Sequence, residues 1–219
     1  MNMAGYTEVE IKLRVANVAA VRRRLALARA RPTANGRVHE MNVLFDTPQG
    51  GFAKQGQLLR MRVERASGKV GRAGGAAKEH TVLTYKGPAI KNTSGGNGPR
   101  KRYKMREEVE VGVADPERLR LILEALGLRG WFRYEKYRTS FQLPATCRWA
   151  AGLHVELDET PIGNFLELEG PTQAIDRAAE LLGYSPRDYI TQSYLALFLG
   201  ESRKQGTPAT DMVFLPSKK

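Results

Sequence analysis

Charged and apolar residues alternate strictly in TEVEIKLRV, residues 7–15, near the start of the chain. Successive side chains of an extended strand point to opposite faces, so Glu8, Glu10 and Lys12 would share one face. Carboxylates bind divalent cations through oxygen atoms, whereas lysine and arginine bind phosphate. One face of a single strand therefore carries both residue types that a complex of a metal ion with a polyphosphate needs.

The same pattern returns further along the chain, in segments such as LLRMRVER and KMREEVEV. For one strand alone, a solvent-exposed face is the ordinary interpretation, because exposed faces are normally charged. Arginine and glutamate two residues apart in almost every strand are harder to explain in this way. The acidic and basic residues on these further faces are Arg60, Arg62, Glu64, Lys86, Lys104, Arg106, Glu108, Glu110, Lys136, Arg138, His154, Glu156, Asp158, Glu167 and Glu169.

Period-two alternation with β-branched and aromatic residues predicts eight strands. We expect them at Glu8–Val15, Met41–Asp46, Leu58–Arg65, Thr81–Lys86, Tyr103–Val113, Phe132–Leu143, Leu153–Asp158 and Asn164–Glu169. A further candidate, Cys147–Ala150, could lengthen the seventh strand. Apolar residues at helical spacing and the helix-stopping glycines predict four helices. These are Val18–Ala30, a helix from Asp115 to Gly127, Pro171–Leu182, and one from Ile190 to about Gly200.

Four amphipathic helices need apolar surface to cover, and only the apolar faces of the strands offer it. If those faces point outward, the charged faces must point inward. We therefore expect an α+β fold, a closed eight-stranded antiparallel β-barrel with a polar interior and about four covering helices. Residues 1–200 would form this single domain, and 201–219 a loosely held tail, of which Met212–Leu215 could dock. Because unpaired buried charges are costly, such an interior would be wet and suited to a charged guest.

The overall composition favours an anionic guest. The chain has 219 residues and a formal net charge of +12. Many of its basic residues lie in strands beside acidic ones and are not interleaved with exposed aromatic residues, so we do not expect a nucleic-acid partner. A single cysteine, Cys147, excludes an internal disulfide and predicts a reducing, cytoplasmic setting. No apolar run approaches the roughly 20 residues that a membrane helix needs, so we expect no membrane partner.

ExExK on the first strand (Glu8, Glu10, Lys12) resembles the signature of the CYTH superfamily, the triphosphate tunnel metalloenzymes. The resemblance continues in the same order over about residues 6 to 200. Its further segments are FDTP (45–48), LRMR (59–62), TYKGP (84–88), REEVE (106–110), YEKYR (134–138), LDETPIGNFLELEG (157–170) and SYLALF (193–198).

The resemblance implies a tunnel that binds a triphosphate together with Mg²⁺ or Mn²⁺. It implies phosphate binding by Lys12, Arg60, Arg62, Lys86, Arg106, Lys136 and Arg138. It implies metal binding by Glu8, Glu10, Glu108, Glu110, Asp158, Glu167 and Glu169, of which Glu8, Glu10, Glu167 and Glu169 are the main candidates. Lys12, with Glu8 and Glu10, would lie at the reacting end. A carboxylate or Lys12 could act as the base, and both alternatives stay open.

Three functions fit this resemblance. The form of TYKGP and FxYEKYR favours a class IV adenylyl cyclase, which converts ATP to cyclic AMP and pyrophosphate. Hydrolysis of inorganic triphosphate or thiamine triphosphate is the second alternative, and a non-catalytic polyphosphate- or nucleotide-binding module is the third. Tyr85, Tyr134 and Phe165 could stack a base, although aromatic residues in strands are more often core. Dimers are common among such barrels, so a homodimer is a further open expectation.

Overall fold

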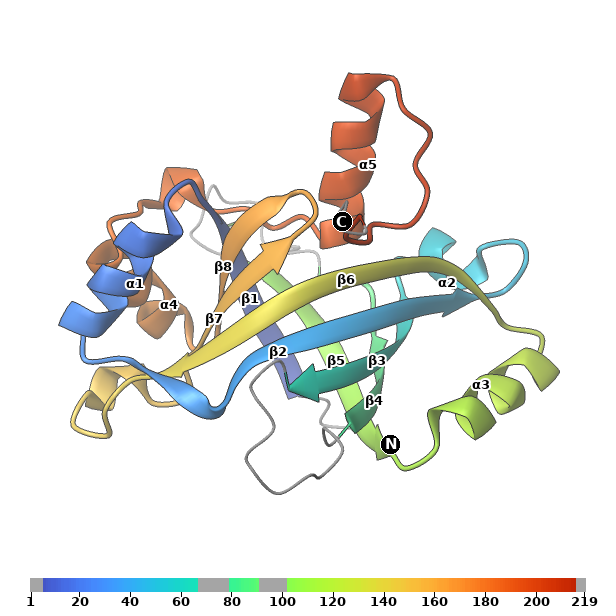
Figure 1. Ribbon diagram of the computed structural model, residues 1–219, viewed down its shortest axis with the longest axis horizontal. Helices are drawn as coiled ribbons and strands as arrows, with labels where there is room; N and C mark the ends of the chain where they lie inside the picture. The colour runs from blue at the N-terminus through green and yellow to red at the C-terminus, as the bar shows by residue number, and fades with distance from the viewer. Residues whose placement is uncertain (1–5, 67–78, 91–101, 216–219) are drawn as a thin grey trace.

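Eight antiparallel strands close into a barrel in the computed structural model, which describes residues 6–66, 79–90 and 102–215 (Figure 1). Around the barrel the strands follow the order β1-β5-β4-β3-β2-β6-β7-β8. Their bounds are β1 Tyr6–Val15, β2 Arg31–Asp46, β3 Leu58–Ala66, β4 Glu79–Lys86, β5 Lys104–Val113, β6 Arg129–Gln142, β7 His154–Thr160 and β8 Gly163–Glu169. The expected closed, eight-stranded antiparallel barrel is confirmed.

The helices begin where the sequence offers capping residues. Asn17 and Asp115 accept backbone hydrogen bonds at the starts of α1 and α3, and Pro116 occupies the first turn of α3. A four-residue helix, α2, was not predicted, because its sequence GFAK is too short for a helical period. The bounds are α1 Val18–Leu27, α2 Gly51–Lys54, α3 Pro116–Ala125, α4 Thr172–Leu181 and α5 Tyr194–Gln205. None of the described helices is long and apolar enough to cross a membrane.

Two strand predictions need correction. The second strand starts at Arg31 and not at Met41, and its polar first part pairs with β6 across a register shift between Pro32 and Arg37. That part lacks apolar alternation, so only its pairing partner reveals it as a strand. The candidate strand at 147–150 was wrong. Its residues form a 3₁₀ turn, which the hydrogen bond from the Ala150 amide to the Cys147 carbonyl closes.

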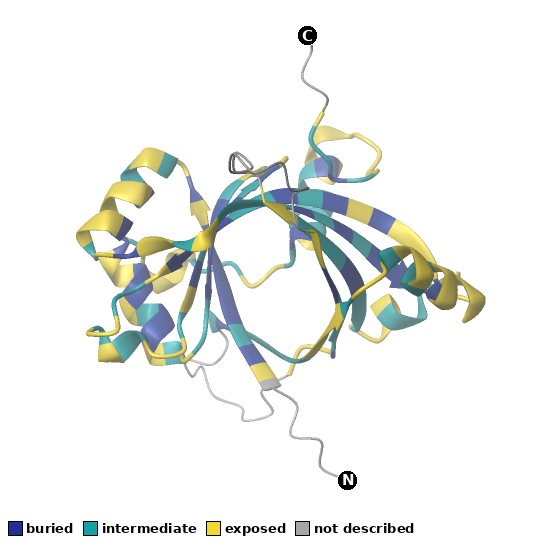
Figure 2. Cartoon of the chain, turned by 60° about the horizontal axis from the view of Figure 1, so that its bottom comes forward, coloured by how far each residue is buried: buried dark blue, intermediate teal, exposed yellow. Residues whose placement is uncertain are grey.

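The apolar faces of the strands point outward, and helices cover much of them. Ile11 and Leu13 of β1 are fully buried in a cluster with Leu166 and Leu168 of β8, beneath α1 and Ile175 of α4. A second outer cluster lies beneath α3, where Leu123 and Leu119 contact Phe45 of β2 and Met61 of β3. Figure 2 shows the helices flanking the barrel, with exposed outer faces and buried strands behind them.

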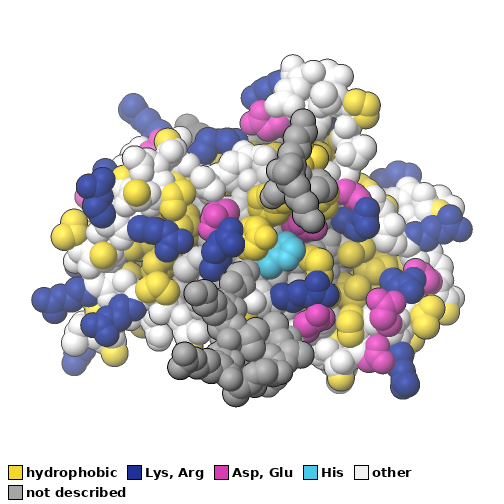
Figure 3. All heavy atoms as spheres, viewed as in Figure 1, with side chains coloured by type: hydrophobic (Ala, Val, Ile, Leu, Met, Phe, Trp, Pro, Cys, Tyr) yellow, Lys and Arg dark blue, Asp and Glu magenta, His cyan; other side chains and the backbone are white. Residues whose placement is uncertain are grey.

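The helical cover is incomplete over β5, because Val109 and Val111 on its outer face are 50% and 57% exposed. Basic residues also lie outside the barrel. Arg22 and Arg23 on α1 are exposed, and Figure 3 shows lysine and arginine side chains spread over this end of the molecule. Most of the positive net charge therefore lies outside the barrel interior, where basic and acidic side chains nearly balance.

The end of the barrel beside α5 is filled by apolar side chains. Leu44 and Phe165 of the barrel pack there with Tyr194 and Phe198 of α5. The helix runs beyond its expected end, and the segment after it returns to the barrel. Met212 is 1% exposed and exchanges backbone hydrogen bonds with β6 at Arg133 and Glu135. The docking of Met212 that the sequence left open is thus observed.

Candidate active site

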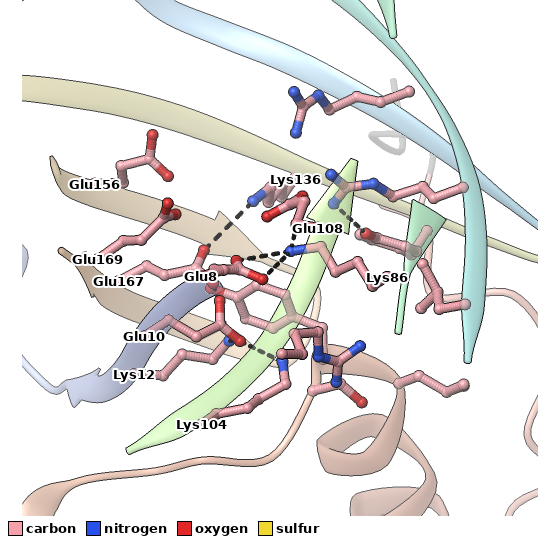
Figure 4. Close-up of a pocket in the computed structure, with 18 of the residues that line it drawn as sticks. Glu8, Glu10, Lys12, Lys86, Lys104, Glu108, Lys136, Glu156, Glu167 and Glu169 are labelled. Carbon is pink, nitrogen blue, oxygen red and sulfur yellow. Dashed lines mark hydrogen bonds and ion pairs between the residues drawn. The ribbon is translucent and has the colours of Figure 1, made fainter. Parts of the chain in front are cut away.

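A cavity of about 230 Å³ lies in the barrel interior, and charged side chains from most of the strands line it. Figure 4 shows Glu156, Glu167 and Glu169 side by side, with Lys86 and Lys104 reaching toward Glu8 and Glu10. The lining residues are Glu8, Glu10, Lys12, Leu44, Leu58, Arg60, Arg62, Lys86, Lys104, Arg106, Glu108, Glu110, Tyr134, Lys136, Arg138, His154, Glu156, Glu167, Glu169, Ser193, Tyr194 and Leu195.

The carboxylates of β1 and β5 lie toward the same end of this tunnel. On β1 the two glutamates precede Lys12, whereas on β5 Lys104 and Arg106 precede the glutamates. Because the two strands are antiparallel, with Glu8 opposite Arg106 and Glu10 opposite Lys104, both orders place acidic groups at the same end. Glu169 lies opposite Glu10 and extends this acidic end onto β8. The basic groups are interleaved with the carboxylates, since Lys86 lies opposite Glu108 and Lys12 lies opposite Glu167.

On the wall formed by β1, β4 and β5, two of the three lysines each pair with two carboxylates. Lys86 Nζ lies 2.7 Å from Glu8 and 3.1 Å from Glu108. Lys12 Nζ lies 3.1 Å from Glu10 and 2.9 Å from Glu167. Lys104 pairs with the same Glu10 oxygen that Lys12 contacts. Charge-assisted bonds of this kind are short and strong.

The wall formed by β6, β7 and β8 is a denser ion-pair network. Arg138 pairs with Glu156, Asp158 and Glu167, and it lies 3.5 Å from Glu40 of β2. Lys136 Nζ lies 3.0 Å from Asp158 and 3.4 Å from Glu40. Both cations are thus neutralised by several buried carboxylates, which is the arrangement that buried charges require.

The structure brings together all the residues expected to bind phosphate, and all the expected metal ligands except one. Asp158 does not line the cavity and is 0% exposed. Its carboxylate accepts hydrogen bonds from Lys136, Arg138 and the Tyr194 hydroxyl, the last at 2.7 Å. This geometry suits a residue that positions the two cations.

Four residues with contacts in the site were absent from the sequence prediction. Lys104 and Glu156 belong to the charged faces recognised in the sequence, so the alternation did contain their signal. Glu40 lies in a strand with no charged repeat and is recognisable only from its contacts with Lys136 and Arg138. Tyr194 belongs to the SY motif of the last helix, and its ring lies beneath the Lys12 ammonium.

The three aromatic residues considered for base stacking are not equally placed. Phe165 is fully buried in the apolar cluster, with its ring edge against Tyr194. Tyr85 accepts a hydrogen bond from Gln57 and does not line the cavity. Tyr134 lines the cavity but is 92% buried and bonded to Arg60. The tunnel therefore presents ionic side chains, with no open aromatic face among its described residues.

Neighbouring carboxyl groups have opposite pKa shifts. Burial, reinforced by the charge of Glu10, raises the pKa of Glu8 to about 8, against the opposing effect of Lys86. Burial would also raise the pKa of Glu10, but Lys12 and Lys104 outweigh it and lower that pKa to about 2. Burial similarly opposes the charge of Lys12, yet Glu10 and Glu167 raise its pKa. Near neutral pH, Glu10 and Lys12 are thus ionised, and Glu8 keeps a proton to higher pH than a free glutamate does.

The donor set fits a hard divalent cation, because carboxylate oxygens are the preferred ligands of Mg²⁺ and Mn²⁺. The carboxylates of Glu10 and Glu108 lie close enough to Glu8 that their charges add to the rise in its pKa. In the described part of the chain, however, no three carboxylates or histidines are already arranged around one point. These side chains would have to turn away from their lysine partners to bind a metal ion.

Comparison with known proteins agrees with this geometry. A family model for the CYTH domain matches residues 6–194. The chain belongs to the CYTH domain family. A search of curated proteins gives no match.

Several solved structures share the CYTH barrel. A candidate adenylate cyclase from Vibrio parahaemolyticus is 20% identical, with a TM-score of 0.67 over 88% of this chain and 98% of the other. The PH1819 protein from Pyrococcus horikoshii is 22% identical, with a TM-score of 0.65 over 89% and 99%. HpAC1 from Hippeastrum, a candidate adenylyl cyclase described as having a dominant triphosphatase activity, is 22% identical, with a TM-score of 0.53 over 92% and 97%. At these identities the likeness shows the fold alone.

Proposed function

We propose that this CYTH protein is a divalent-metal-dependent enzyme that acts on a triphosphate held in the tunnel. The observation that carries the proposal is the convergence of basic and acidic side chains on one narrow cavity. A polyanion-binding module has no need of those carboxylates, whereas phosphoryl transfer uses both groups. We further propose hydrolysis of the terminal phosphate as the reaction, because the lining offers basic groups for a triphosphate chain and, among its described residues, no open aromatic face for a base.

The chain's own residues would bind and orient the triphosphate. Arg60, Arg62 and Arg106 would donate to phosphate oxygens, and Lys86 would add a point charge beside Glu8. Lys12 remains protonated between Glu10 and Glu167, so it would stabilise charge on the phosphoryl oxygens and not act as the base.

Glu8, Glu10, Glu108, Glu167 and Glu169 would hold Mg²⁺ or Mn²⁺ at the acidic end. When bound, the metal would neutralise phosphate charge and polarise the attacking oxygen. This division of roles assigns positioning to the basic groups and activation to the acidic end.

Cyclisation of ATP, the reaction favoured by the sequence motifs, is the second candidate because of a pocket beside the tunnel. This pocket of about 550 Å³ lies at the connection between β6 and β7 and shares His154 and Glu156 with the tunnel lining. Phe141 and Cys147 give it apolar surface, and Ser140 adds a hydroxyl. A nucleoside bound there would place its α-phosphate next to the acidic end.

The direct test offers ATP, tripolyphosphate and thiamine triphosphate with Mg²⁺ or Mn²⁺ and identifies the products. Orthophosphate supports hydrolysis, whereas cyclic AMP with pyrophosphate supports cyclisation. A bulky Ala150→Trp substitution in the side pocket separates the candidates further, since it should suppress cyclisation and spare tripolyphosphate hydrolysis. Both reactions share one tunnel, so tripolyphosphate should compete with ATP. Turnover of none of these substrates would contradict the enzymatic proposal.

A further inference from the structure

The carboxylates proposed to bind metal and the lysines proposed to bind phosphate are one another's partners in the structure. Glu10 pairs with Lys12 and Lys104, and Glu8 pairs with Lys86. Neither set can meet its ligand without releasing the other. An ion pair of this kind is stable as long as both members stay together, and it becomes costly when only one is removed.

Lys104 is the member of this network with the fewest alternatives. Lys12 would keep Glu167 at 2.9 Å if Glu10 turned away, and Lys86 would keep Glu108 at 3.1 Å if Glu8 turned away. Among the described residues, Lys104 has one carboxylate partner, Glu10. Loss of that contact would leave a largely buried ammonium group facing the cavity, where only an incoming anion could compensate it.

Arg106, the next inward-facing residue of β5, provides the contrast. It lines the same cavity, yet no carboxylate of the described chain forms an ion pair with it. Its Nε is buried and has no hydrogen-bond partner. Arg106 is therefore able to bind a phosphate without disturbing any carboxylate, whereas Lys104 must first leave Glu10.

We propose that Lys104 couples metal binding to triphosphate binding, because Glu10 exchanges Lys104 for the metal ion while Lys104 moves to a phosphate oxygen. This inference rests on the proposed function, and it assigns Lys104 a role that its neighbour Arg106 does not share. The metal alone would take Glu10 from Lys104 and leave Lys104 uncompensated, and the triphosphate alone would leave Glu10 with Lys12 as its remaining described partner. Both ligands together would compensate both members of the Lys104–Glu10 pair. Coupling of this kind is reciprocal: each ligand strengthens the other's binding by the same factor.

The experiment measures binding by titration calorimetry, with Mn²⁺ and with an imido-bridged tripolyphosphate analogue that resists hydrolysis. Each ligand is titrated alone and in the presence of the other, for the wild type, Lys104→Met and the matched control Arg106→Met. Because Mn²⁺ also binds the free analogue, the decisive quantity is the difference in coupling between the two variants. Lys104→Arg, which keeps a cation beside Glu10, serves as the conservative variant, and thermal melts verify that all four proteins fold.

Lys104→Met should bind Mn²⁺ alone roughly tenfold more tightly, since Glu10 loses a competing charged partner. Its coupling factor should fall, and Lys104→Arg should restore it. Arg106→Met should lower the affinity for the analogue by the same factor with and without Mn²⁺, which leaves the coupling factor unchanged. Wild-type coupling in Lys104→Met, or an equal loss in both variants, would overturn the inference and leave the proposed function standing. If the analogue binds to none of the proteins under any condition, the proposed function itself fails.

Discussion

Two walls of the tunnel use the same residue types differently. On the β6–β8 wall, Arg138 contacts four carboxylates and Lys136 contacts three, so these cations are largely compensated. On the opposite wall, formed by β3, β4 and β5 and called the open wall below, Arg106 has no described carboxylate partner. Arg60 reaches Glu110 only at 3.5 Å. The first wall is organised as a structural network, and the second keeps charge available for a guest. Equal charge in the sequence therefore does not mean equal function.

The largest expected effect is loss of stability on the dense wall. Asp158→Ala should lower the free energy of unfolding by about 3–5 kcal/mol, because Lys136 and Arg138 would lose a fully buried partner. Chemical denaturation monitored by circular dichroism measures this change in the free energy of unfolding. Glu110→Ala is the matched change on the open wall, where the side chain is 40% exposed, and should cost no more than about 1 kcal/mol. Similar losses in the two variants would remove the distinction between the walls.

The next effect concerns turnover at the acidic end. Glu10→Gln is nearly isosteric and should reduce metal-dependent turnover by about 100-fold or more while the fold is retained. Glu8→Gln should act in the same direction. Initial rates of phosphate release at saturating Mg²⁺, with unfolding curves of the same samples, test this. Full activity in either variant would show that the carboxylate does not take part in the reaction.

The sequence predicted the barrel because alternation is a local property of each strand. Glu8, Arg62 and Glu169 could be placed on inward faces from their neighbours alone, once the helices required an apolar exterior. The first part of β2 could not be predicted, since its polar residues gain strand structure only from pairing with β6. Glu40 was missed for the same reason: its role depends on Lys136, which lies opposite it on another strand. Ion-pair partners are set by register, and a single sequence does not reveal register.

A smaller effect should appear on the open wall, where binding and stability separate. Arg106→Met should weaken tripolyphosphate binding by about tenfold, because a charged hydrogen-bond donor is lost, and should leave the melting temperature nearly unchanged. Arg138→Met should lower both binding and stability, since four carboxylates lose their cation. Calorimetric binding and thermal melts on both variants make the comparison. A large drop in melting temperature for Arg106→Met would place Arg106 in the structural network.

The smallest expected effect is a pH dependence that differs between adjacent glutamates on β1. Because the pKa of Glu8 is raised to about 8, the folded protein holds a proton that the unfolded chain releases near 4.5, and stability is lost as pH rises through this window. The pKa of Glu10 is lowered, so its contribution is present above about 4.5 and is lost as pH falls toward 2.

Relative to wild type, Glu8→Gln should therefore gain stability between pH 5 and 8, by at most about 1.4 kcal/mol per pH unit. The difference in stability between Glu10→Gln and wild type should disappear only in acid. Urea unfolding at a series of pH values tests both slopes. Parallel slopes for the two variants would mean that the lysines compensate Glu8 as fully as they compensate Glu10. The two walls would then not differ in how fully their charges are compensated. The charge available to a guest would depend on the tunnel as a whole.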